Sequence, residues 1–116
     1  MEGGESLRYL KEAEAAYRGA LEVHTRNQLP QQWAMTQNHL GLVLRDLGMR
    51  AEGGESLRYL NETAATYRAM LEVFTRAEMP QQWAMAQNNL GLTLYALGIR
   101  AKGGERALLQ ELPVRL

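Results

Sequence analysis

The chain has 116 residues, and its 13 basic side chains balance its 13 acidic ones, so the formal net charge is zero. Hydrophobic residues make up 46% and charged residues 22%, which is typical of a folded domain and too apolar for a disordered chain. The neutral charge argues against a general nucleic-acid-binding protein, and the lack of Cys excludes disulfides and Cys-bound metal sites. No apolar run approaches the roughly 20 residues that cross a bilayer. Residues 1–5 lack the basic start of a secretory signal, so we expect a cytoplasmic setting.

A 50-residue repeat organises the chain. Residues 1–50 align without a gap on residues 51–100, agreeing at 33 positions and differing at 17. A third unit opens at residue 101 and departs from the pattern after Arg106. We therefore predict a single repeat domain over 1–116, made of two full units and a divergent C-terminal stub over 104–116.

The first helix of each unit is predicted over 5–26 and over 55–76. Glycine pairs precede both segments and a proline follows each shortly afterwards, as expected at helix boundaries. In the second copy, residues spaced three and four apart form one apolar face, which consists of Leu57, Leu60, Ala64, Tyr67, Leu71 and Phe74.

The second helix of each unit is predicted to start at Pro30 or Pro80 and to run to Leu47 or Leu97. Proline suits the first turn of a helix, and Gly48 and Gly98 are placed to end it. The buried stripe of the first copy comprises Trp33, Leu40, Leu44 and Leu47. No segment alternates with the period of a strand, so the sequence predicts an all-α fold.

Gly41 and Gly91 lie inside these predicted helices, where glycine costs about 1 kcal/mol relative to alanine. A tolerated defect is one interpretation. Because the glycine recurs at the same place in both copies, we favour a close approach of a neighbouring helix. Trp33 and Trp83 likewise allow ligand stacking, although packing between repeats is the interpretation we favour.

Two motifs carry a family resemblance. Asn38-His39-Leu40-Gly41 and Asn88-Asn89-Leu90-Gly91 resemble the core of the first helix of a tetratricopeptide repeat, and the segments 17–23 and 67–73 resemble that of its second helix. The likeness covers about residues 5–100 and is closest to long-period bacterial versions. The period of 50 departs from the usual length of about 34 residues.

The resemblance implies antiparallel helix-turn-helix units stacked as a short right-handed α-solenoid. In that family the Trp-bearing helix comes first. The segments would therefore be a lone second-type helix (5–26), a full pair (31–76) and a first-type helix (81–97).

The resemblance also implies a concave groove that binds a peptide or protein segment. Amides on the Trp-bearing helices can pair with a peptide backbone, and Met35 and Met85 can add apolar contacts. The groove residues we predict are Asn38, His39, Leu42, Arg45, Asn88, Asn89, Leu92 and Tyr95. Whether the asparagines face a groove or tether a neighbouring helix stays open.

An alternative function is self-assembly into a homo-oligomer, such as a dimer, through the more apolar C-terminal half. The residues we predict for that contact are Phe74, Leu108, Leu109 and Leu112. Catalytic, zinc and phosphate-binding motifs are missing, so we expect no enzyme activity, no cofactor and no metal, and neither nucleic acid nor a membrane as partner.

Overall fold

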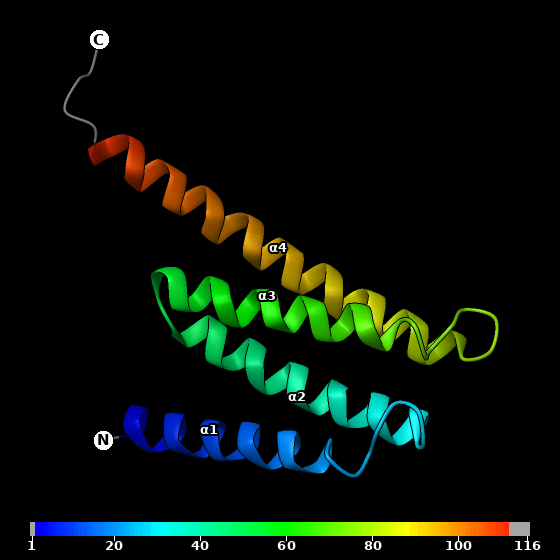
Figure 1. Cartoon of the computed structure of the whole chain (residues 1–116). Coiled ribbons are helices and arrows are strands. Elements are labelled where there is room, and N and C mark those ends of the chain that lie inside the picture. The colour runs from blue at the N-terminus through cyan, green and yellow to red at the C-terminus, as the bar shows by residue number, and fades with distance from the viewer. Residues whose placement is uncertain (1, 112–116) are drawn as a thin grey trace.

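The structure is a computed structural model that describes the backbone of residues 2–111 and the side chains of residues 4–103. Within these residues all regular structure is helical, which confirms the predicted all-α fold class. The helices are α1 (Glu2–Ala20), α2 (Pro30–Arg50), α3 (Gly53–Met70) and α4 (Pro80–Glu111). Each helix packs against the next one along the chain, and α4 reaches beyond the ends of the other three (Figure 1).

The connections from α1 to α2 and from α3 to α4 have the same geometry. In the first, Thr25 accepts a hydrogen bond from the Gln28 amide through its hydroxyl (3.3 Å) and one from the Leu29 amide through its carbonyl (2.8 Å). Thr75 does the same for the Glu78 and Met79 amides. A threonine that binds nearby backbone groups competes with helix hydrogen bonding. The repeated turn therefore brings each following proline into the first turn of its helix.

α1 and α3 end six residues before the ends that the sequence predicts for them. α1 ends at Ala20 and α3 at Met70, whereas the predicted limits are 26 and 76. After Ala20 the amides of Glu22 and Val23 bond to carbonyls three residues back, which tightens the backbone into turns. The β-branched residues that follow in both copies have lower helix propensity and lead into the threonine turn.

A connection of two residues joins α2 to α3. Gly53 has a φ of +59°, which favours glycine, and it reverses the chain direction directly after Ala51 and Glu52. The hydroxyl of Ser56 donates a 2.6 Å hydrogen bond to the carbonyl of Gly48, near the end of α2. This bond satisfies a helix-terminal carbonyl that lies away from water and fixes the start of α3 against the end of α2.

Neither Gly48 nor Gly98 ends its helix, which corrects the prediction. A Cβ atom at Gly48 would lie 2.9 Å from Leu60 and 3.1 Å from the Cβ of Tyr59, so this glycine serves close packing of α3 on α2. α4 continues through Gly98 and Gly103 to Glu111 as one helix of 32 residues, instead of ending at Leu97. Residues 104–111 of the predicted stub are therefore part of α4, and residues 112–116 lie outside the described chain.

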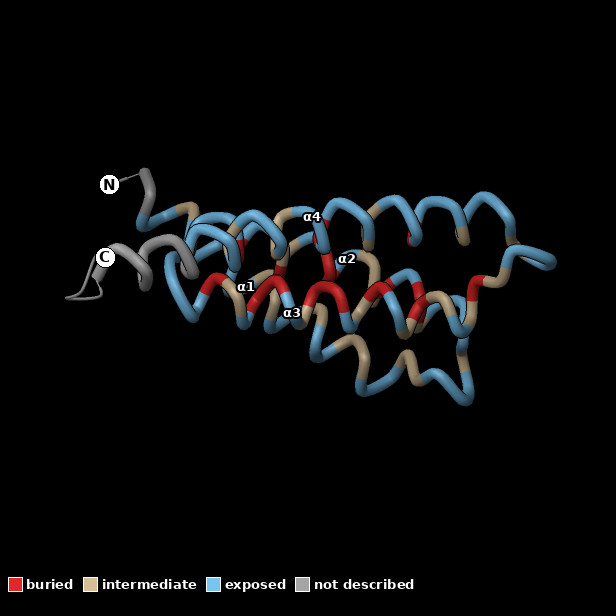
Figure 2. The backbone as a smooth tube through the Cα atoms, turned by 90° about the horizontal axis from the view of Figure 1, so that it is seen from above, coloured by how far each residue is buried: buried red, intermediate tan, exposed pale blue. Residues whose placement is uncertain are grey.

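The core consists of two apolar clusters at the interfaces between neighbouring helices. One centres on Ala34, Tyr67, Met70, Phe74 and Ala86, and the other on Leu40, Leu44, Leu47 and Tyr59. Figure 2 shows the buried positions gathered along the middle of the molecule, while most of α4 is exposed. Gly41 belongs to this packing because a Cβ there would lie 3.1 Å from the ring of Tyr67, which confirms the close approach predicted for it. The same prediction is wrong for Gly91, where a Cβ would have no neighbour within 4 Å among the described residues.

None of the helices, over the residues described, combines the length and the apolar character that crossing a membrane requires.

Candidate functional site

A pocket of about 310 Å³ opens between the N-terminal halves of α2 and α4. Its volume is at the lower end of the range of about 300–1,000 Å³ that is typical of small-molecule and side-chain sites. The residues that line it are Gln31, Met35, Asn38, His39, Phe74, Met79, Gln82 and Met85.

The helical spacing of these residues explains why they meet. Gln31, Met35, Asn38 and His39 follow one another at intervals of four, three and one, so they lie along one side of α2. Gln82 and Met85 occupy the first turns of α4, and Phe74 and Met79 come from the connection that precedes it. The pocket therefore depends on the repeated threonine turn that brings α4 beside α2.

Asn38 gives the pocket an unused hydrogen-bond acceptor. Its side-chain oxygen is buried and has no hydrogen-bond partner. An amide oxygen left in this state costs free energy, which a donor in the pocket would recover once the Asn38 side chain turns its oxygen towards the pocket. Most of the remaining lining is methionine and aromatic surface, which adapts its shape to an apolar group.

A second buried oxygen without a hydrogen-bond partner belongs to Tyr67 on α3. The hydroxyl of Tyr67 is fully buried without a hydrogen bond, against Gly41 and therefore three residues along α2 from Asn38. Burial raises the pKa of Tyr67; the charge of Arg45 opposes this shift and that of Asp46 adds to it. Burial therefore holds the Tyr67 hydroxyl in its uncharged form.

His39 connects the pocket to α1. Its ring centroid lies 5.4 Å from that of Tyr17, at a tilt of 33°. Contact with the phenol orients the imidazole at the edge of the pocket, where the His39 side chain is exposed.

Of the eight groove residues that the sequence predicts, the pocket contains Asn38 and His39. Leu42 is exposed one turn further along α2, and Arg45 is half-buried. The four residues predicted from the second copy lie elsewhere on α4: Asn88, Leu92 and Tyr95 are exposed and Asn89 is half-buried.

Sequence reasoning missed Gln31, Gln82, Phe74 and Met79 as lining residues. The signal for Gln31 was present, because it continues the stripe of Met35 and Asn38 by one turn towards the N-terminus. Phe74 also corrects the self-association prediction, since it is 2% exposed and belongs to the core. The other residues predicted for that contact are not placed: the side chains of Leu108 and Leu109, and the whole of Leu112, lie outside the described residues.

An apolar stripe continues beyond the pocket on both Trp-bearing helices. Its members repeat every seven residues, close to two helical turns, and all are exposed. They are Met35, Leu42 and Met49 on α2, and Met85, Leu92 and Ile99 on α4. Arg100 donates a 3.1 Å hydrogen bond to the Met49 carbonyl, which brings the far ends of the two stripes close together.

Each tryptophan ring contacts an arginine of its own chain. Trp33 packs against the core cluster around Tyr67, and the Arg26 guanidinium lies 5.6 Å from its ring centroid. Arg76 lies 5.7 Å from the ring of Trp83 in the same way. These contacts favour packing over ligand stacking for Trp33, whereas Trp83 is half-buried and belongs to neither core cluster.

Among the described residues, no three His, Asp or Glu side chains come close enough to bind a metal ion together. Comparison with known proteins gives no relative: no family model, no curated protein and no solved structure matches the chain.

Proposed function

We propose that the chain is a non-enzymatic protein-interaction module that binds an extended peptide or protein segment in the pocket between α2 and α4. The observation that carries this proposal is the unpartnered amide oxygen of Asn38 within a pocket lined by methionine and aromatic side chains. An extended peptide can supply both a hydrogen-bond donor and an apolar side chain to this surface. It offers a backbone N–H to Asn38 and an apolar side chain to Met35 and Met85.

The exposed apolar stripes support a ligand longer than a single side chain. They continue from the pocket along both Trp-bearing helices, so further residues of a bound segment have apolar surface to cover. Exposed apolar patches of this kind mark binding surfaces in soluble proteins. The amides of Gln31 and Gln82 at the pocket edge add donors and acceptors that do not depend on the ligand's sequence.

We further propose that the helix pairs are tetratricopeptide-like and stack as layers of a right-handed solenoid. Contacts between equivalent parts of the two repeats support this arrangement. Arg18 of α1 pairs with Glu62 of α3 at 3.0 Å, and Arg26 pairs with Glu72 at 3.0 Å between the two threonine turns. Stacked layers bring equivalent segments of neighbouring repeats side by side in this way.

A peptide-library selection on the intact chain tests the binding function. Peptides that are retained would be synthesised with a fluorescent label, and their affinity measured by anisotropy. We expect Asn38→Ala to weaken binding by about tenfold, because it removes one hydrogen bond to the ligand. Met85→Glu should weaken it further by placing a charge in the apolar wall.

Asn88→Ala is the matched control. Asn88 is the repeat equivalent of Asn38, is exposed and does not line the pocket. Circular dichroism establishes that each variant keeps its helices. Equal affinities of the Asn38→Ala and Asn88→Ala proteins for the selected peptides would contradict the proposed site.

A further inference from the structure

One face of α4 is uncovered although its counterpart on α2 is buried. Leu44 is 1% exposed and its repeat equivalent Leu94 is 41% exposed. α3 fills the space beside Gly41 and Gly48, whereas a Cβ atom at Gly91 or Gly98 would have no neighbour within 4 Å. The face that α3 covers on α2 is therefore free on α4, over the part of the chain that is described.

α1 has the complementary uncovered face. α3 packs on α2 through Tyr59, which is 6% exposed, but the equivalent Tyr9 on α1 is 60% exposed. A shallow depression marks this face of α1 and is lined by Glu5, Ser6, Tyr9, Leu10 and Ala13.

The two free faces retain the residues that form the α2–α3 interface. On α4 the glycines recur as Gly91 and Gly98, together with Ala84 and Leu94. On α1 the partner residues recur as Ser6 and Tyr9, and as Leu10 and Tyr17, which are half-buried because one side of each already packs against α2. Arg45 on α2 has Tyr95 as its repeat equivalent on α4, so the α4 face is more apolar than the corresponding face of α2.

We propose that α1 of a second copy packs on α4 as α3 packs on α2. In this arrangement Tyr17 of the second copy covers Gly91, and its Leu10 and Tyr9 cover Gly98. These contacts reproduce those of Tyr67 with Gly41 and of Leu60 and Tyr59 with Gly48. None of these contact residues lines the pocket between α2 and α4, although Tyr17 packs beside His39 at its edge, so this inference does not rest on the proposed function.

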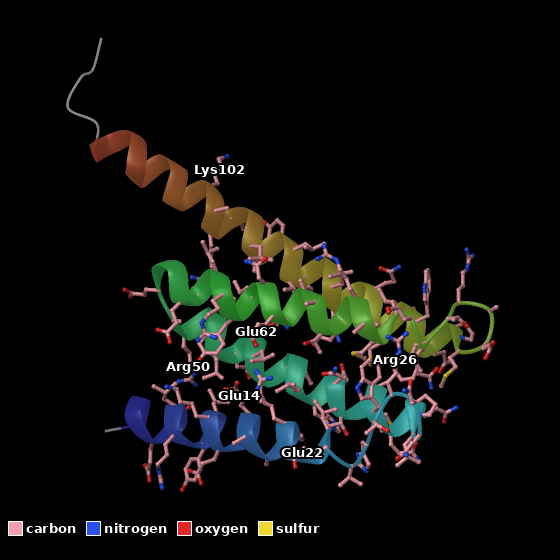
Figure 3. All side chains as sticks on the ribbon, viewed as in Figure 1. Glu14, Glu22, Arg26, Arg50, Glu62 and Lys102 are labelled. Carbon is pink, nitrogen blue, oxygen red and sulfur yellow. The ribbon has the colours of Figure 1, made fainter. Side chains whose placement is uncertain are left out.

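The charges fit the same register. Within the chain, Arg18 pairs with Glu62 of the next repeat. In the proposed contact the equivalent pair is Arg68 with Glu12 of the second copy, because Arg68 is the repeat equivalent of Arg18 and Glu12 is that of Glu62. In the same way, the equivalent of the pair Arg26–Glu72 is Arg76 with Glu22 of the second copy. All four residues are exposed, and Glu22 lies at the lower edge of the molecule in Figure 3. Exposed ion pairs add little affinity but help to fix register.

Because the contact joins two different faces, each added copy leaves one face of each kind open. Such a heterologous contact forms chains or closed rings, whereas an isologous contact stops at a dimer. We expect the average mass of the intact protein, measured by light scattering or sedimentation, to rise with concentration beyond that of a dimer.

Two variants that block one face each give the decisive test. Tyr9→Glu blocks the α1 face, and Gly98→Glu blocks the α4 face. Each variant alone should be a monomer, with association weakened by at least about tenfold. Mixed together they should form a one-to-one heterodimer, because each supplies the face that the other lacks. Gly103→Glu, at an exposed helical glycine with no neighbour within 4 Å, should assemble like the unmodified chain.

Cysteine cross-linking tests the register, since the chain itself has no Cys. The Cβ position at Gly48 lies 3.1 Å from the Cβ of Tyr59, close to the range of about 3.5–4.5 Å in disulfides. Mixed Gly98→Cys and Tyr9→Cys proteins should therefore cross-link under mild oxidation. Lys11→Cys replaces Tyr9→Cys as the control, because its repeat equivalent Asn61 is exposed.

A monomeric intact chain at all concentrations would overturn the proposal, as would a mixture of the two glutamate variants that stays monomeric. A symmetric contact between α4 faces would also overturn it, and its sign is a Tyr9→Glu protein that still dimerises.

Discussion

Nδ1 of His24 lies 3.1 Å from the hydroxyl oxygen of Thr36, at hydrogen-bonding distance, where the second repeat has Phe74 and Ala86 in contact within an apolar cluster. One repeat thus fills this space with a polar pair and the other with an apolar pair. The two positions change together because a polar group in a buried space needs a partner.

The pairing can be tested by measuring whether substitutions at positions 74 and 86 have coupled effects on stability. We expect Phe74→His alone to destabilise the fold by about 2–3 kcal/mol, because it buries an imidazole without a partner. Adding Ala86→Thr restores the pair of the first repeat and should recover about 1 kcal/mol. Urea unfolding of the single and double variants measures both values. Strictly additive effects would show that the two positions are independent.

The equivalent glycines Gly41 and Gly91 should respond to alanine with opposite signs. Gly41→Ala places a methyl group 3.1 Å from the Tyr67 ring and should cost about 1–3 kcal/mol. Gly91→Ala meets no neighbour within 4 Å and should stabilise α4 by about 0.5–1 kcal/mol through its higher helix propensity. Thermal unfolding at low protein concentration compares the two. A matching loss of stability in both variants would contradict the packing described for Gly41.

The junction between α2 and α3 makes a similar comparison possible for serine. Ser56→Ala removes the buried 2.6 Å bond to the Gly48 carbonyl and should lower the free energy of unfolding by about 1–2 kcal/mol. Ser6→Ala, at the equivalent position on the uncovered face of α1, should change it by less than about 0.5 kcal/mol. Both can be measured by chemical denaturation, and a smaller effect at Ser56 than at Ser6 would count against the role of this bond.

The pH dependence of the free energy of unfolding tests the burial of Tyr67. Because burial raises its pKa above the ordinary value of about 10, the folded chain keeps the phenol proton at pH values where the unfolded chain has lost it. This contribution to stability is complete below about pH 10 and is lost as the pH rises through the raised pKa.

Tyr67→Phe should remove that part of the alkaline loss of stability. It also deletes a buried hydroxyl without a partner, so at neutral pH the variant should be as stable as the parent or more stable by up to about 1 kcal/mol. Unfolding at neutral and alkaline pH gives the comparison, and ultraviolet titration should show one of the five tyrosines ionising last. A parent and variant with the same alkaline profile would refute this assignment.

The repeat explains which features of the fold could be predicted from the sequence. The apolar spacing and the prolines predict the four helices and the regions where they start, although the predicted ends of α1, α3 and α4 are wrong; the recurrence of glycine predicts the close approach at Gly41. The role of Gly48 could not be predicted, since a glycine near the end of an apolar stripe suits both a helix end and a close contact. The presence of Leu60 beside it decides between them, and that is a tertiary fact.

The same reason limits the prediction of the site. Asn38 and Asn88 are identical in sequence and in repeat position, yet one lines a pocket and the other is exposed. The difference arises because the first turns of α4 and the connection before them close the pocket beside Asn38, whereas no described helix occupies the corresponding place beside α4. The sequence pattern therefore identifies the asparagines, and the neighbouring helices determine which of them lines a pocket.

The short link that Gly53 and Ser56 secure between α2 and α3 has a consequence for construction. It joins one 50-residue unit to the next, so the same junction can be repeated in a longer chain. In the stacked arrangement that we propose, inserting another copy of residues 51–100 after Arg100 should end α4 at a new junction of this kind and lengthen the molecule by one helix pair, so that rods of chosen length can be built from this sequence.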